Sequence, residues 1–282
     1  MYCPNCGRQI SEGSHFCPYC GADVEGTPLP SEEREADASR ASIPPKDLDQ
    51  LLGETFGIYR RYPGQFLFLG FLPQIPSLLS IAAPGWLSVL LTIIGVAAYI
   101  LVGGAAAYAV AQQSLGREID VGYCLSKAWS RAFTLIGASV LLLLALAGSA
   151  VLMVIIVGIP LFFFLLVSWF FVEQAIMIEG QGSIEAFGRS RNLVRGTWWR
   201  VFGIGVVFGV ILIVLGVIEG FVSSGVGLAS PTAGAIIGAI ISMFIFPIAA
   251  IGATLVYFDL RARKEGYDLQ EMASEVAPTW NR

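Results

Sequence analysis

Long apolar stretches recur along the chain and are separated by short polar segments. Each stretch holds roughly 18 to 25 residues, which is enough for a helix to cross a hydrocarbon layer of about 30 Å. The pattern therefore predicts an all-α integral membrane bundle. Its six transmembrane helices are expected at residues 65–83, 86–111, 133–157, 160–180, 200–222 and 234–258.

The composition supports a membrane protein over a soluble one. Mean hydropathy is +0.71, and only 13% of the residues are charged, against about 25% in an ordinary soluble domain. We expect the membrane domain to cover residues 51–264 and a cytosolic C-terminal tail to cover residues 265–282. The net charge of −4 conceals an uneven distribution of basic residues.

Basic residues fall in alternate loops between the predicted helices. The intervening turns, "APGW", "VGIP" and "EGFVSSGVGLASPTAG", contain no Lys or Arg. Since cytoplasmic loops collect Lys and Arg, this predicts an even number of spans with both termini in the cytosol, at a cell (inner) membrane. The basic face also suits anionic lipid headgroups. The loop residues are Arg60, Arg61, Arg117, Lys127, Arg131, Arg189, Arg191, Arg195, Arg200, Arg261, Arg263 and Lys264.

Three basic, aromatic stretches precede apolar segments at similar spacing. They are residues 54–70, 121–137 and 185–203, which end at Gly70, Gly137 and Gly203. The recurrence predicts three helical hairpins, each introduced by an amphipathic helix in the membrane interface with Trp at headgroup depth. Two interpretations stay open: duplication, or the ordinary composition of cytoplasmic loops. The tryptophans, Trp129, Trp198 and Trp199, are expected to anchor the interface; gripping a substrate is the alternative.

The N-terminal segment "MYCPNCGRQISEGSHFCPYCGADV" contains two CPxCG turns. Two thiolates from each turn can reach one ion, and four thiolates in tetrahedral geometry form a closed structural zinc site. Residues 1–22 therefore predict a zinc ribbon that holds one structural Zn²⁺, with iron in a rubredoxin-like site as the alternative. His15, the only histidine, is expected not to be a ligand. The predicted metal ligands are Cys3, Cys6, Cys17 and Cys20.

The ribbon and the segment after it are expected to be cytosolic. Thiolate ligands persist where disulfides do not form, and the N-terminal residues lack the apolar run of a cleaved leader. Residues 23–50 are rich in Pro, Ser, Ala and acidic residues, so we expect a flexible tether. Acidic residues outnumber basic ones in ribbon and tether, which disfavours nucleic acid as a partner. A protein partner is expected instead; a stable cap with no separate task is the alternative.

Charged residues within the predicted spans are the other candidates for function. Glu173 lies in span 4, where a carboxylate is costly and usually faces other helices or water. A position near the cytosolic boundary is the alternative. Glu219 is expected to be solvated at the outer end of span 5. Pro73, Pro76 and Pro247 are expected to kink their helices. Small residues, among them Gly103, Gly104, Gly234 and Gly238, predict close helix contacts.

Acidic residues at the inner boundary predict ion pairs. Carboxylates beside an anionic lipid surface are unfavourable unless cations neutralise them. We therefore expect Glu179 and Asp259 to pair with Arg189, Arg191 and Arg261, which would hold the loop before span 5 against the C-terminal segment.

Two stretches, "MIEGQGSIEAFGRSRNLVRGTWWRVFGI" and "YFDLRARKEGYDL", resemble bacterial multi-pass proteins of the glycerophosphoryl diester phosphodiesterase membrane domain family. The N-terminus separately resembles the bacterial CPxCG zinc-ribbon module. The resemblance implies a polytopic membrane domain that accompanies a catalytic barrel in some relatives. This chain has no room for that barrel, so the resemblance implies no catalytic residue and no activity.

The leading functional hypothesis is a non-enzymatic scaffold or regulatory protein whose ribbon engages a partner. A histidine-dependent triad or dyad is not expected, since the one histidine lies in the ribbon. The alternative is a transporter or lipid-handling protein that uses kinked helices around Glu173.

Overall fold

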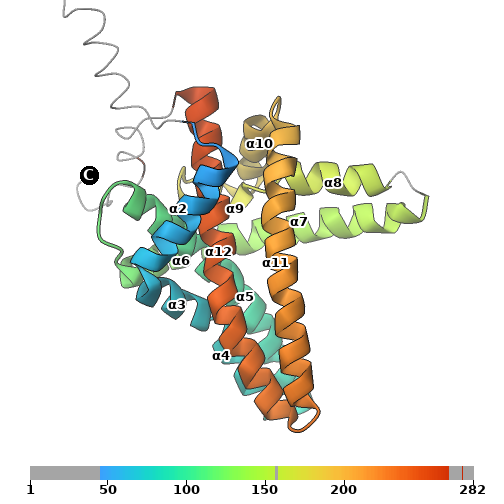
Figure 1. The fold of residues 1–282 in the computed structure, drawn as a ribbon. Helices are drawn as coiled ribbons and strands as arrows, with labels where there is room; N and C mark the ends of the chain where they lie inside the picture. Colours follow the sequence, from blue (N-terminus) through green and yellow to red (C-terminus); the bar gives the residue numbers. More distant parts are fainter. Residues whose placement is uncertain (1–44, 156–157, 267–274, 276–282) are drawn as a thin grey trace, which may run out of the picture. The chain divides into compact units, whose positions relative to one another are not determined.

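Figure 1 shows the fold in a computed structural model, which describes residues 45–155, 158–266 and 275. Every regular element in these residues is a helix, so the all-α prediction is confirmed for the described part. The predicted ribbon and most of its tether lie outside it. The helices are α2 (Leu48–Arg61), α3 (Pro63–Phe71), α4 (Gln74–Ser80), α5 (Gly85–Ser114), α6 (Val121–Ser130), α7 (Ala132–Val151), the 3₁₀ turn η1 (Leu152–Ile155), α8 (Gly158–Ser168), α9 (Val172–Met177), α10 (Ser183–Val194), α11 (Trp198–Gly227) and α12 (Pro231–Glu265).

Five helices in the described residues are long and apolar enough to cross a membrane, which supports a membrane protein. They correspond to five of the six predicted spans. The candidate spans are Gly85–Ser114, Ala132–Val151, Gly158–Met177, Trp198–Gly227 and Pro231–Glu265. The third of them comprises α8, a short turn and α9.

The first predicted span, residues 65–83, is instead divided into α3 and α4. Pro73 lies at the break, and Pro76 lies in the first turn of α4. A proline has no N–H to donate and its ring crowds the preceding turn, so two prolines three residues apart interrupt the helix. The prediction of six spans is therefore not confirmed.

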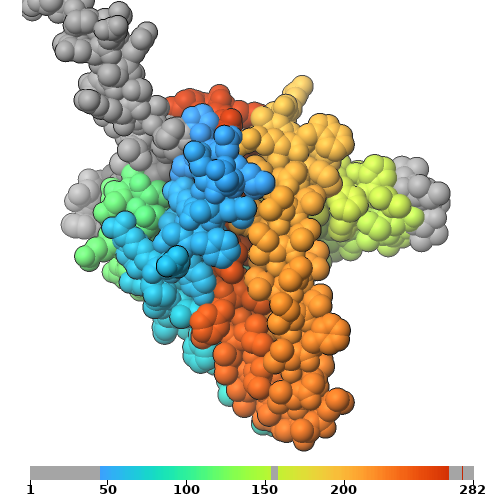
Figure 2. Space-filling model, in the orientation of Figure 1, coloured from blue at the N-terminus to red at the C-terminus, as the bar shows by residue number. Residues whose placement is uncertain are grey.

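The pair α7 and α8 runs across α11 and α12 in Figure 1, and it projects beyond α11 in Figure 2. Helices that cross one bilayer lie within about 40° of its normal. The predicted arrangement of three transmembrane hairpins is therefore not confirmed. Both α7 and α8 are apolar on every face, so their sequence favours a membrane without specifying the direction in which the pair leans.

The core lies where the C-terminal halves of α5 and α12 meet. Residues 104–112 of α5 and 254–261 of α12 are buried in continuous runs. They pack against α2, α3 and α9, with Tyr108 and Tyr257 among the largest fully enclosed side chains. This buried run ends at Arg261, and Arg263 follows it, so we call this end of the helical unit the basic end.

The helices α11 and α12 contact each other closely through small residues. A Cβ atom added to Gly234 would lie 2.6 Å from the carbonyl oxygen of Ser223 and 2.7 Å from Cα of Gly227. Only glycine fits this approach, so the predicted contact at Gly234 is confirmed. The hydroxyl of Ser230 accepts a hydrogen bond from the N–H of Ala233 at 3.3 Å and caps the start of α12.

The three basic, aromatic stretches each form a short helix followed by an apolar one: α2 before α3, α6 before α7, and α10 before α11. Trp129 and Trp199 are 73% and 77% exposed, as interface anchors would be, whereas Trp198 is half-buried. The glycines that mark the repeat are not equivalent. A Cβ at Gly70 would meet the carbonyl oxygen of Met243 at 2.4 Å, whereas at Gly203 it would meet nothing. Duplication itself stays a prediction.

Candidate functional site

The four predicted metal ligands, Cys3, Cys6, Cys17 and Cys20, lie outside the described residues. Within residues 45–155, 158–266 and 275, no group of three or more His, Cys, Asp or Glu side chains could hold a metal ion. The other candidates from the sequence lie in the described helices.

The predicted fourth span is interrupted just before Glu173. The chain leaves α8 at Ser168 and re-enters a helix, α9, at Val172. Ser190 of α10 bridges this break: its hydroxyl donates to the carbonyl of Ser168 at 2.9 Å and accepts from the N–H of Phe171 at 3.1 Å. Ser190 is fully buried. One side chain from a neighbouring helix therefore satisfies the backbone groups that the break releases, as membrane helices require.

Glu173 lies in the first turn of α9 and faces α5. A Cβ added to Gly103 would lie 2.4 Å from its Oε1 atom, so glycine at this position leaves room for the carboxylate as it lies here. Oε1 is buried and has no hydrogen-bond partner among the described residues. One turn further along α9, Met177 packs against Gly104. The structure thus places Glu173 inside a helix contact, and confirms that Gly103 and Gly104 make close contacts.

Asp259 occupies the centre of a charged cluster at the basic end. Its side chain is 0% exposed and accepts a hydrogen bond from the N–H of Lys46 at 2.7 Å. Arg200 pairs with it at 3.1 Å and Arg263 at 3.0 Å. Both guanidinium groups also donate to the carbonyl of Lys46, at 2.6 and 2.9 Å. The backbone before α2 is therefore held by α11 and α12.

A second cluster surrounds Glu179 after α9. Arg189 donates to it at 2.6 Å, Arg261 lies 3.5 Å away, and the hydroxyl of Tyr257 also donates to it. Arg189 reaches on to Glu265, with Nη2 to Oε2 at 2.7 Å. Hydrogen bonds to Glu265, and then those to Glu179, raise the pKa of the Arg189 guanidinium although burial lowers it. This cluster joins α10 to the end of α12.

The predicted ion pairs are therefore confirmed for Glu179, which contacts both Arg189 and Arg261. They are wrong for Asp259, whose partners are Arg200 and Arg263. Arg191 is exposed. Arg263 lies four residues after Asp259 on the same helix face, a spacing that favours pairing and could have identified it.

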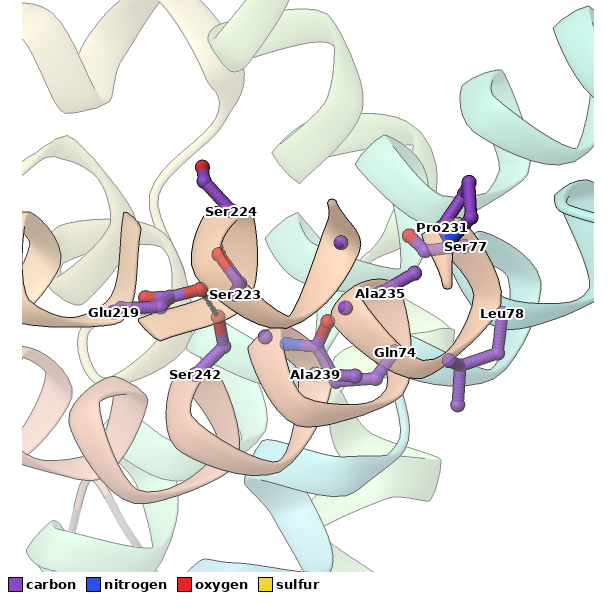
Figure 3. Close-up of a pocket in the computed structure, with 13 residues that line it drawn as sticks. Gln74, Ser77, Leu78, Glu219, Ser223, Ser224, Pro231, Ala235, Ala239 and Ser242 are labelled. Atoms are coloured by element: carbon purple, nitrogen blue, oxygen red, sulfur yellow. Dashed lines mark hydrogen bonds between the residues drawn. The ribbon is translucent and has the colours of Figure 1, made fainter. Parts of the chain in front are cut away.

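A polar pocket between α4, α11 and α12 lies near the turn that joins α11 to α12 (Figure 3). Its volume is about 370 Å³. Glu219 lies in its wall and accepts a hydrogen bond from the hydroxyl of Ser242 at 2.5 Å. The sequence predicts that Glu219 is solvated at the outer end of span 5, whereas in the structure it is half-buried in the wall of this pocket. The pocket is not predictable from the sequence, because Gln74 and Ser242 reach the same space from helices far apart in the chain.

Cys124, the one cysteine outside the CPxCG turns, is buried in α6. Burial, with a smaller contribution from the negative charge of Asp120, raises the pKa of its thiol from 9.0 to about 12. A thiol must ionise to act as a nucleophile or a metal ligand. Cys124 therefore contributes packing to the core.

Comparisons with known proteins separate the chain into two regions. A zinc-ribbon domain matches residues 2–24, which include all four CPxCG cysteines. The family described as Domain of unknown function (DUF7847) matches residues 64–260. No curated protein and no solved structure matches the chain. The comparisons give no support for the glycerophosphoryl diester phosphodiesterase membrane domain family. Because the second match covers most of the chain, this protein belongs to the DUF7847 family and carries a zinc-ribbon domain at its N-terminus.

Proposed function

We propose that the protein is a non-enzymatic, multi-pass membrane protein that holds a zinc ribbon at the membrane surface, where the ribbon docks a protein partner. The cluster around Asp259 carries this proposal. Lys46 is the point at which the segment from the ribbon enters the helical unit, and its backbone N–H and C=O are both held there. A fixed attachment point gives a tethered module a limited search volume, which raises its effective concentration near the membrane.

The metal is proposed from the chemistry of the ligands. Residues 2–24 match a zinc-ribbon domain, and Cys3, Cys6, Cys17 and Cys20 supply the four thiolates of a closed tetrahedral site. Bound Zn²⁺ stabilises the fold of such a short segment. Metal analysis of the full-length protein is expected to give one zinc per chain, and Cys17→Ser is expected to lose it. Iron, or no metal under reducing conditions, would overturn this assignment.

The orientation is proposed from the basic end. Lys46, Arg200 and Arg263 meet there, and cytosolic loops collect such residues. We propose that this end faces the cytosol at the cell (inner) membrane, beside anionic lipid. Single cysteines introduced at Gly85, Ser230 and Ser274 are expected to react from outside, outside and inside. Reaction of the cysteine at Ser274 from outside would contradict the orientation.

Docking can be tested with the full-length protein in its own membrane. A photo-reactive residue in place of Ile10 is expected to give discrete adducts, and Cys17→Ser is expected to abolish them. Asp259→Asn removes the charge that holds Arg200 and Arg263 at the attachment point, so it is expected to weaken the adducts. Asp49→Asn, which changes an exposed carboxylate nearby, serves as the matched control. Adducts that persist unchanged in Cys17→Ser would refute docking through the ribbon.

Transport is the second candidate function, and the buried Oε1 atom of Glu173 favours it. Carboxylates without a partner inside membrane helices often mark ion or proton pathways. A flux assay in proteoliposomes, comparing wild type with Glu173→Gln, tests this alternative. Flux that requires Glu173 would establish transport, and the docking experiment above would then decide whether both functions coexist.

A further inference from the structure

The pocket beside the α11–α12 turn contains one negative charge within an apolar surface. Glu219 lies eight residues before the end of α11 at Gly227, or about 12 Å at 1.5 Å per residue. Its neighbours Ile218 and Phe221 are exposed. A carboxylate in such surroundings is unfavourable unless it faces water or a cation.

The polar side chains of the pocket converge on this carboxylate. In Figure 3, Glu219 and Ser223 of α11 and Ser242 of α12 face the same space, and the amide of Gln74 points into it from α4. Ser242 donates its proton to Glu219, so its oxygen lone pairs remain able to accept.

The chemistry of the lining excludes several classes of ligand. It contains no Lys or Arg, so an anion would meet only the charge of Glu219. It offers one carboxylate, whereas Ca²⁺ takes six to eight oxygen ligands. It contains no aromatic side chain, and aromatic cages are the usual site for quaternary ammonium groups. The volume of the pocket, about 370 Å³, is enough to admit a small amine.

We propose that this pocket binds a primary ammonium group, with Glu219 as its counter-ion. The three N–H donors of the ammonium group can bind the carboxylate of Glu219 and the hydroxyl oxygens of Ser223 and Ser242, and the amide oxygen of Gln74 offers a further acceptor. The group can belong to a free amine or to the ethanolamine headgroup of a phospholipid. This site is independent of the ribbon and of docking.

Ethylamine is the probe, and the full-length protein is reconstituted in phosphatidylcholine nanodiscs. Wild type is expected to bind ethylamine saturably. Glu219→Gln keeps the shape and removes the charge, so it is expected to bind at least about tenfold more weakly, as the loss of a charged hydrogen-bond partner predicts. Glu185→Gln is the matched control, because Glu185 is an exposed carboxylate on α10. The affinity of this variant for ethylamine is expected to equal that of wild type.

A second variant decides the outcome if Glu219→Gln does not fold. A Cβ at Gly238 would lie 3.5 Å from Cβ of Ser223 and 3.9 Å from Oε1 of Glu219, so Gly238→Ala is accommodated and places a methyl group beside the carboxylate. It is expected to weaken ethylamine binding with an unchanged melting temperature. Nanodiscs that contain phosphatidylethanolamine identify the source of the ammonium group. If the lipid headgroup occupies the site, it competes with ethylamine and the apparent Kd for ethylamine rises. An unchanged Kd assigns the site to a free amine.

Three results would overturn the proposal. The first is the absence of saturable ethylamine binding to wild type. The second is binding that survives both Glu219→Gln and Gly238→Ala at wild-type affinity. The third is equal competition by Na⁺ or by tetramethylammonium, which would show that the pocket does not recognise the N–H donors of a primary amine.

Discussion

The carboxylate of Asp259 accepts a hydrogen bond from the backbone N–H of Lys46 at 2.7 Å, across 213 positions of the chain. Most contacts between the helices of a bundle are made by side chains, and another side chain of similar size can often make the same contact. Here a side chain in the last turns of α12 holds the backbone just before α2. The backbone at Lys46 is therefore held by this carboxylate and by the two guanidinium groups that pair with it.

Asp259→Asn is expected to destabilise the helical unit by roughly 2–3 kcal/mol. Asparagine can still accept from Lys46, but it cannot neutralise Arg200 and Arg263, and removing one member of a buried ion pair leaves the others uncompensated. The two arginines keep some contact with water, which moderates the loss. The melting temperature in nanodiscs is the measurement. Asp49→Asn, on an exposed carboxylate, should change it little; equal shifts for both variants would contradict a buried cluster.

Ser190→Ala is expected to destabilise the protein by about 2 kcal/mol. The substitution leaves the N–H of Phe171 and the carbonyl of Ser168 without the hydroxyl that now pairs with both, at a buried position. Hydrogen exchange at Phe171 should rise together with the loss of thermal stability. Ser130→Ala is the control, because its exposed hydroxyl donates to the carbonyl of Lys127 within its own helix. If the two variants melt alike, Ser190 does not stabilise the break.

Gly234→Ala and Gly238→Ala form a matched pair on one face of α12. A Cβ at Gly234 would clash with the backbone of α11 at 2.6 and 2.7 Å, so the helices must separate, at a cost of about 2–3 kcal/mol. A Cβ at Gly238 meets nothing closer than 3.5 Å. Melting temperatures should therefore fall for Gly234→Ala alone. A fall of the same size for Gly238→Ala would show that helix propensity or a general effect, and not the contact, is responsible.

Local pattern was enough to predict most helices and part of the basic end. Apolar length identified five candidate spans, and charge at the inner boundary predicted the contacts of Glu179 with Arg189 and Arg261. The spacing of small residues predicted the close helix contact at Gly234. These features depend on residues close together in the sequence, or on the thickness and surface charge that membranes have in common.

Features that depend on packing between distant segments were not predictable. The break after Ser168 lies in an apolar run and is stabilised by Ser190, 22 residues away. The lean of α7 and α8 is not specified by helices that are apolar on every face. The pocket around Glu219 needs Gln74, which lies on a helix that the sequence predicted as part of a continuous span.

Cys124 is expected to resist alkylation in the folded protein up to about pH 10. Burial raises the pKa of its thiol to about 12, and only the thiolate reacts. Ser126→Cys, in a Cys124→Ser background, places a thiol at an exposed position two residues further along the same helix. Mass spectrometry after iodoacetamide treatment at pH 8 should find that control position modified and Cys124 unmodified in wild type.

The raised pKa of the Cys124 thiol also makes the stability of the folded protein depend on pH. The folded state holds the neutral thiol, whereas the unfolded state ionises near the ordinary value of 9.0. The contribution of the buried thiol is therefore complete below about pH 9 and is lost as pH rises from 9 toward 12. Cys124→Ala removes the titrating group, so its melting temperature should decline less steeply than that of wild type over this range. Parallel declines, or ready alkylation of Cys124 at pH 8, would show that the thiol is accessible to water.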